Sequence, residues 1–169
     1  MKVNVKKIVV SGMLIAVAVS LSSFSIPIGA SKCFPIQHLV NVVAGIFLGP
    51  VYGVSMAFCT SLIRNLMGTG SLLAFPGSMV GAWLGAVMFK YSNKLAMAYI
   101  GEVFGTGILG GMLCYPVATM IMGKEAAVFA YVLPFLMSTL CGTVIAAVLV
   151  GALYKSGAFA YLNHMLAEN

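Results

Sequence analysis

Residues 127–154 read AVFAYVLPFLMSTLCGTVIAAVLVGALY and contain no charged side chain. An α-helix rises about 1.5 Å per residue, so about 20 apolar residues cross a hydrocarbon core of roughly 30 Å. An uncharged apolar run of this length is typical of a transmembrane helix rather than of the core helix of a soluble protein. We therefore predict that this segment crosses a membrane.

The rest of the chain has the same character. Hydrophobic residues make up 62% of the 169 residues, charged residues make up only 7%, and the mean hydropathy is +1.09. Soluble domains are about half apolar and about one-quarter charged. The composition therefore predicts an all-α integral membrane protein in contact with the lipid bilayer, and it excludes an ordinary soluble fold.

Glycine and proline clusters and isolated charges separate the apolar runs from one another. They divide the chain into six predicted spans, near residues 6–24, 37–48, 51–67, 76–91, 95–121 and 127–154. We predict a compact six-helix bundle that forms a single transmembrane domain, residues 1–169. The second span is shorter than a full crossing, so we expect it to be tilted or buried among its neighbours. The first apolar run resembles a signal peptide but lacks a clear cleavage site, so we retain it as a helix.

The basic residues predict the orientation, because Lys and Arg accumulate on the cytoplasmic side of membrane proteins. With the N-terminus inside, the cytoplasmic set is larger than the outer set: Lys2, Lys6, Lys7, Lys90, Lys94 and Lys155 against Lys32, Arg64 and Lys124. We predict a multi-pass protein of the cell membrane with both termini in the cytoplasm and the longer loops outside. The net charge of +6 forms no dense basic face, so we expect no nucleic-acid partner.

Polar side chains near the predicted outer ends of the spans form a candidate binding site. Polar groups inside a membrane cost several kcal/mol unless they are paired or hydrated, so they often mark functional sites. The candidates are His38, Asn41, Arg64, Asn65, Ser71, Phe75, Ser78, Tyr115, Thr119 and Tyr131. Aromatic rings with a few hydrogen-bonding groups suit a small heteroaromatic solute. Each residue also has a structural interpretation, such as snorkelling of Arg64 or an interfacial belt of tyrosines.

Two further expectations concern the surroundings of this site. The connection 25–36 contains two prolines and large apolar residues, so we predict a lid loop, with Phe34 and Gln37 as its contacts to the site. A connector that rests on the rim of the bundle fits the composition equally well. Glu102 lies about two turns from the cytoplasmic start of the fifth span, and we predict a structural role for it, away from the cavity.

Small residues spaced four apart allow close helix packing in lipid. The fourth span contains Gly77, Gly81 and Gly85, and the fifth contains Gly101 and Gly105, which predicts internal packing of these helices. The first span contains Gly12, Ala16 and Ser20 at the same spacing. For this third stripe we predict a flat surface that receives a partner subunit.

The sequence carries no recognisable catalytic or metal-binding constellation. The histidines are His38 and His164, neither stands in a His-Glu-x-x-His motif, and the four cysteines are widely spaced. We predict that the protein is not an enzyme and has neither a metal nor a cofactor. A self-sufficient carrier or channel stays open as an alternative, although a carrier would use internal carboxylates and Glu102 is the only candidate. An intramembrane hydrolase ranks far below both.

Three segments carry a resemblance to a known family: QHLVNVVAGIFLGPVYG (37–53), LIRNLMGTGSLLAFPGSMVGAWLGA (62–86) and GEVFGTGILGGMLCYPVA (101–118). Together they resemble the substrate-binding S components of energy-coupling factor (ECF) transporters. The resemblance is to the ThiW type, which is linked to the thiazole precursor of thiamine. It implies six helices and an external pocket covered by the first loop.

The resemblance also implies a ligand and partners. The ligand would be hydroxyethylthiazole or a related thiazole, and the partners would be a transmembrane coupling protein and two cytoplasmic ATPases. In related S components an Ala-x-x-x-Ala stripe on the first helix contacts the coupling protein, and Gly12-x-x-x-Ala16, extended to Ser20, resembles it here. The family model further implies that the whole S component topples in the membrane to carry its pocket inward. An S component for another vitamin is the nearest alternative.

Overall fold

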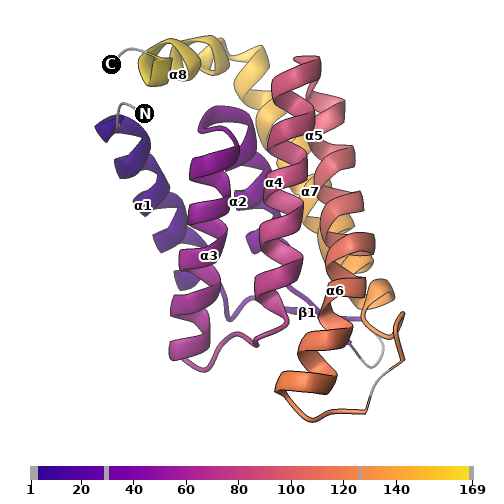
Figure 1. Cartoon of the computed structure of the whole chain (residues 1–169). Helices are drawn as coiled ribbons and strands as arrows, with labels where there is room; N and C mark the ends of the chain where they lie inside the picture. Colours follow the sequence, from indigo (N-terminus) through magenta and orange to yellow (C-terminus); the bar gives the residue numbers. More distant parts are fainter. Residues whose placement is uncertain (1–3, 29–30, 126, 168–169) are drawn as a thin grey trace.

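The computed structural model describes residues 4–28, 31–125 and 127–167 and is a helical bundle with one small hairpin (Figure 1). The helices are α1 (Val5–Ser20), α2 (Pro35–Phe47), α3 (Pro50–Leu66), α4 (Ala74–Ser92), α5 (Leu95–Glu102), η1 (Val103–Gly110), α6 (Gly111–Pro116), η2 (Val117–Ile121), α7 (Val132–Lys155) and α8 (Ala158–Ala167). Strands β1 (Ile26–Ile28) and β2 (Ser31–Cys33) pair antiparallel, with Ile26 opposite Cys33. The all-α prediction is confirmed, and a helix lies in each of the six predicted spans.

The segments from α5 to η2 form one continuous helix, Leu95–Ile121, with the bounds that the sequence predicts. Two parts of it, η1 and η2, are wound as π-helix. Pro116 lies directly before η2, where its missing N–H group removes an α-helical hydrogen bond. Within the described part of the chain, this helix and Val132–Lys155 are the two that are long and apolar enough to cross a membrane.

Helix α2 occupies the centre of the bundle. It has 13 residues, most of them buried, and it packs against α7, α4 and α3. A helix of this length is only about 20 Å long, shorter than the hydrocarbon core. The structure therefore agrees with the expectation that this short segment is buried among its neighbours.

The two ends of the described chain meet at one end of the bundle. The Asn4 side chain donates to the Leu166 carbonyl at 3.1 Å, and Lys6 Nζ donates to the Met165 carbonyl at 3.1 Å. The hairpin and the connections that follow α3 and η2 lie at the opposite end (Figure 1). An even number of crossings would place the chain ends in this way.

Glycines join α4 directly to α5 and η1. A Cβ atom added to Gly101 would lie 2.6 Å from Gly85 Cα, and one added to Gly105 would lie 2.9 Å from Gly81 Cα. Real side chains do not tolerate such distances, so the two backbones are in direct contact. The predicted internal packing of the two glycine stripes is confirmed, and we call this contact the glycine seam.

Candidate functional site

A cavity of about 260 Å³ opens between the start of α2, the end of α3 and the start of α4, with α7 as its fourth wall. Its lining consists of Phe34, Gln37, His38, Arg64, Gly68, Thr69, Gly70, Ser71, Leu73, Ala74, Ser78, Pro134, Phe135 and Ser138. Aromatic and aliphatic side chains form part of the wall, and hydroxyl, amide, imidazole and guanidinium groups form the rest. This combination can hold a small ring and fix its orientation through a few hydrogen bonds.

Arg64 brings a positive charge to the cavity wall, although its side chain is only 3% exposed. Its Nη1 donates to Gln37 Oε1, and its Nη2 donates to the Thr69 carbonyl at 3.1 Å. The guanidinium also lies over the Phe34 ring, 5.1 Å from the ring centroid. Among the described residues, Arg64 Nε has no hydrogen-bond partner. Arg64 thus connects α3 to α2 and to the segment between α3 and α4, and its Nε–H stays unpaired among the described residues.

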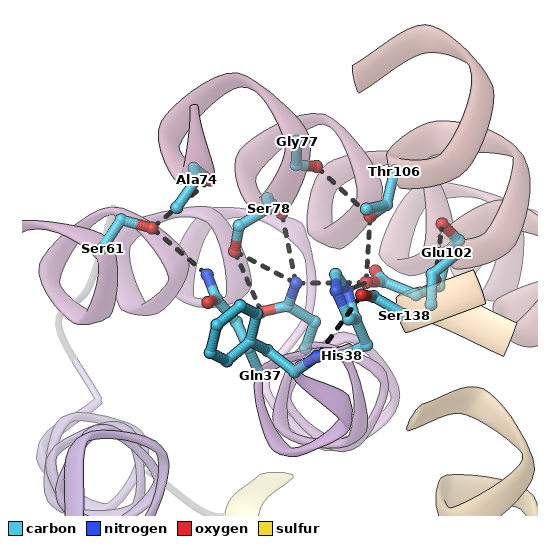
Figure 2. Close-up of polar contacts among 12 residues, drawn as sticks. Gln37, His38, Ser61, Ala74, Gly77, Ser78, Glu102, Thr106 and Ser138 are labelled. Atoms are coloured by element: carbon cyan, nitrogen blue, oxygen red, sulfur yellow. Dashed lines mark hydrogen bonds and ion pairs between the residues drawn. The ribbon is translucent and has the colours of Figure 1, made fainter. Parts of the chain in front are cut away.

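A buried carboxylate lies behind the cavity. Glu102 is 1% exposed, and its Oε1 lies 3.0 Å from His38 Nδ1 (Figure 2). The same oxygen accepts from Asn41 Nδ2 and from Thr106 Oγ1, each at 3.1 Å. Its other oxygen, Oε2, has no partner in the described part of the chain. Three polar groups on one oxygen offset part of the cost of burying this charge.

Glu102 does not line the cavity, but it lies closer to it than the sequence predicts. His38 lines the cavity, and a single hydrogen-bond distance separates it from Glu102. The reason is the packing of α2, because its contacts with α4, α5 and α7 bring His38 of its first turn to Glu102. Glu102 lies roughly 10 Å along the long helix from Leu95, and His38 lies beside it at that depth. The sequence positions of the helix ends do not reveal this depth.

Two amide side chains stand behind the lining and fix it. Asn41 donates to Ser78 Oγ at 3.2 Å, and Ser78 lines the cavity. Asn65 donates to the Ser61 carbonyl at 2.7 Å and to the Ser71 carbonyl at 3.0 Å, which fixes the connection between α3 and α4. Both were candidates for ligand contact, and neither belongs to the cavity wall.

The structure brings together only part of the predicted set. His38, Arg64, Ser71 and Ser78 line the cavity, as do Phe34 and Gln37. Phe75, Tyr115 and Tyr131 do not belong to its lining. The Phe75 ring instead packs against Phe58, with 5.6 Å between ring centroids. Thr119 donates to the Tyr115 carbonyl at 3.0 Å, within its own helix.

The two predicted lid residues are held at the start of α2. Gln37 lies inside the helix, where it donates to Ser61 Oγ at 3.3 Å, and the Phe34 N–H donates to Ser138 Oγ at 3.3 Å. Gln37 is therefore not part of the loop, and Phe34 is its last residue before the helix. Burial raises the pKa of the neighbouring Cys33 thiol to about 11, so this thiol stays protonated.

Sequence reasoning missed about half of the lining. The missed residues are Gly68, Thr69, Gly70, Leu73, Ala74, Pro134, Phe135 and Ser138. Ser138 offered a signal, because it is a polar residue in the more apolar of the two long helices. The glycines and apolar residues offered none, since their side chains carry no chemistry that marks a site.

Gly142 of α7 allows the start of α2 to approach closely enough to place His38. A Cβ atom at this position would lie 2.7 Å from His38 Cβ and 3.1 Å from the Leu39 nitrogen. The absence of a side chain at residue 142 is thus part of the geometry of the site. Among the described residues, no group of three His, Cys, Asp or Glu side chains could hold a metal ion.

Comparison with known families gives the class of the protein. Residues 8–156 match the family model described as thiamine-precursor transporter protein (ThiW). The chain belongs to the ThiW family. The matched region extends from α1 to the end of α7 and includes every residue of the cavity lining. No curated protein matches the chain.

Membership of the ThiW family makes this chain a membrane protein of thiamine-precursor uptake and confirms the predicted resemblance. A transporter needs a site that recognises its solute. The cavity beside Arg64 and His38 is lined only by residues that the ThiW match covers. It is therefore our candidate for that site.

Proposed function

We propose that this ThiW-family chain is the substrate-binding S component of an ECF importer and that it binds hydroxyethylthiazole in the cavity beside Arg64. The observation that carries the proposal is the lining of that cavity, which combines aromatic walls with a small number of polar groups. Phe34 and Phe135 can contact a flat ring. Arg64, His38 and the serine hydroxyls can satisfy a ring nitrogen and an alcohol.

The size of the cavity favours a precursor with one ring. The cavity volume of about 260 Å³ lies just below the roughly 300–1,000 Å³ of typical small-molecule pockets. A single substituted thiazole needs less of this space than the two linked rings of thiamine. The size therefore supports a building block rather than the finished vitamin.

Calorimetric titration of the purified protein with hydroxyethylthiazole tests the proposal. We expect tight binding, with a Kd of about 1 μM or below, equivalent to at least about 8 kcal/mol. Thiamine should bind more weakly. Absence of binding at high micromolar concentration, together with tight binding of a different vitamin, would overturn the ligand and preserve the class.

We further propose six membrane crossings with both termini in the cytoplasm, and docking through α1 to the transmembrane coupling protein that carries the two ATPases. The exposed face of α1 supports the docking surface. Gly12, Ala16 and Ser20 are exposed, and a Cβ atom at Gly12 would meet nothing within 4 Å. Val9 and Met13, which lie beside this stripe, are 55% and 64% exposed.

Ala16→Leu is expected to impair assembly with the coupling protein and leave hydroxyethylthiazole binding unchanged. The added side chain would hold two helices apart where small residues permit close approach. Co-purification with the coupling protein and ATPases measures assembly. Ala96→Leu, at an exposed alanine of α5, is the matched control. Normal assembly of the Ala16 variant would show that this face of α1 is not the interface.

A self-sufficient ion-coupled carrier is the second candidate, and the buried Glu102 carboxylate favours it. Intramembrane carboxylates commonly bind the driving ion in such carriers. Proteoliposomes that contain only this chain distinguish the two candidates. Net thiazole flux without ATP would support the carrier, and strict dependence on the coupling protein and ATPases would support the S component.

A further inference from the structure

His38 connects the cavity to a carboxylate that the cavity does not reach. Its ring lines the cavity, and its Nδ1 lies 3.0 Å from Glu102 Oε1. Glu102 itself is 1% exposed and is not part of the lining. His38 is the lining residue that contacts Glu102 directly, whereas Ser78 is linked to Glu102 through Asn41 (Figure 2).

The neighbours of Glu102 Oε1 determine its role in these hydrogen bonds. Asn41 Nδ2 is purely a donor, and it lies 3.1 Å from this oxygen. Thr106 Oγ1 donates to the same atom at 3.1 Å. A carboxylate only accepts hydrogen bonds, so opposite the ionised Glu102 it is Nδ1 that carries the proton of this contact.

Protonation at Nδ1 fixes the chemistry of the opposite side of the ring. In a neutral imidazole one nitrogen donates and the other accepts. Because Glu102 engages Nδ1, the remaining nitrogen is Nε2, and in the neutral ring it is an acceptor. The other polar groups of the lining include the guanidinium of Arg64, which only donates, and serine hydroxyls, which can do both.

We propose that Glu102 is a positioning residue that makes His38 Nε2 an acceptor for the hydroxyl of the ligand, and so selects heteroaromatic alcohols over rings without a hydroxyl. The proposal rests on the proposed function and adds a determinant of specificity to it. Arg64 supplies the donor for the ring nitrogen, and His38 supplies the acceptor for the alcohol.

A pair of ligands tests this role against a merely structural one. The probes are hydroxyethylthiazole and its ethyl analogue, which lacks only the hydroxyl. The wild-type protein is expected to prefer the alcohol by roughly 10-fold to 100-fold, the usual effect of one buried hydrogen bond. A structural defect would lower the affinity for both probes by the same factor and leave the ratio of the two affinities unchanged.

Glu102→Leu removes the acceptor for Nδ1 and is expected to reduce the preference to below about 3-fold, while the ethyl analogue still binds. Glu102→Gln restores an acceptor oxygen in place of Oε1 and should recover most of the preference. Thr106→Val is the matched control, because it removes another donor to the same oxygen and leaves His38 untouched. It should keep the wild-type ratio.

Nitrogen NMR of the wild-type protein with labelled histidine provides a readout that needs no disruptive variant. His164→Gln assigns the signals, since His38 is then the only histidine in the chain. We expect the Nδ1–H tautomer of His38, with an Nε2 signal that shifts with the alcohol more than with its ethyl analogue. A proton on Nε2, in the other tautomer or in a charged ring, or an undiminished preference in Glu102→Leu, would overturn this role and leave the proposed function intact. Failure of both probes to bind the wild-type protein would overturn both proposals.

Discussion

Gly101→Leu is expected to prevent stable folding of the protein, because its side chain would have to occupy space that the backbone of α4 fills. Even a Cβ atom at this position would lie 2.6 Å from Gly85 Cα and 2.9 Å from the Leu84 carbonyl oxygen. Overpacking among flexible side chains typically costs about 1–3 kcal/mol. Backbone atoms cannot rotate away, so we expect a loss of about 4 kcal/mol or more, which is large against the marginal stability of most proteins.

Thermal unfolding and size-exclusion chromatography in detergent measure this effect. Gly151→Leu is the matched control, because Gly151 also lies within a long helix and a Cβ atom there would meet nothing within 4 Å. The control should unfold near the wild-type temperature, since leucine forms helices better than glycine. A monodisperse Gly101→Leu protein with the stability of the control would refute the direct backbone contact.

The glycine seam also supports the binding site. A Cβ atom at Gly81 would lie 2.9 Å from Glu102 Oε2, so the seam and the carboxylate share one layer of the bundle. Separation of α4 from α5 would withdraw Glu102 from His38. Variants of the seam that still fold should therefore lose the preference for the alcohol ligand as well as stability.

Much of the helical framework could be predicted from the sequence. The bounds of the long helix, Leu95–Ile121, follow from a charged turn before it and a Gly-Lys pair after it. The glycine seam follows from spacing, because residues four apart share a helix face. His38, Arg64 and Ser78 could be predicted as site residues, because polar side chains within apolar segments are rarely buried without a function.

The rest depended on relations between helices that a linear pattern does not contain. Glu102 lies closer to the cavity than predicted because its contact with His38 depends on the packing of α2, not on position within its own helix. Tyr115 and Tyr131 were included for their chemistry, yet neither lines the cavity. Helix α8 was missed because its 10 residues are too few to give a membrane signal.

Arg64→Ala is expected to reduce the affinity for hydroxyethylthiazole by at least about 100-fold, roughly 3 kcal/mol, because several interactions disappear together. Its guanidinium binds Gln37 Oε1 and the Thr69 carbonyl and packs over Phe34. Without it, two acceptors lose their donors and the Phe34 wall loses its support.

Two further variants separate the charge of Arg64 from its geometry. Arg64→Lys keeps the positive charge but cannot reach Gln37 and Thr69 with one planar group, so it should recover only part of the affinity. Asn65→Ala removes bonds that fix the connection behind the cavity, and we expect a smaller loss of about 1 kcal/mol. Titration of each variant with hydroxyethylthiazole measures these losses of affinity, and its unfolding temperature checks that it is folded. A folded Arg64→Ala protein with wild-type affinity would show that Arg64 does not contribute to the site. The ligand would then bind without help from the positive charge in the cavity wall.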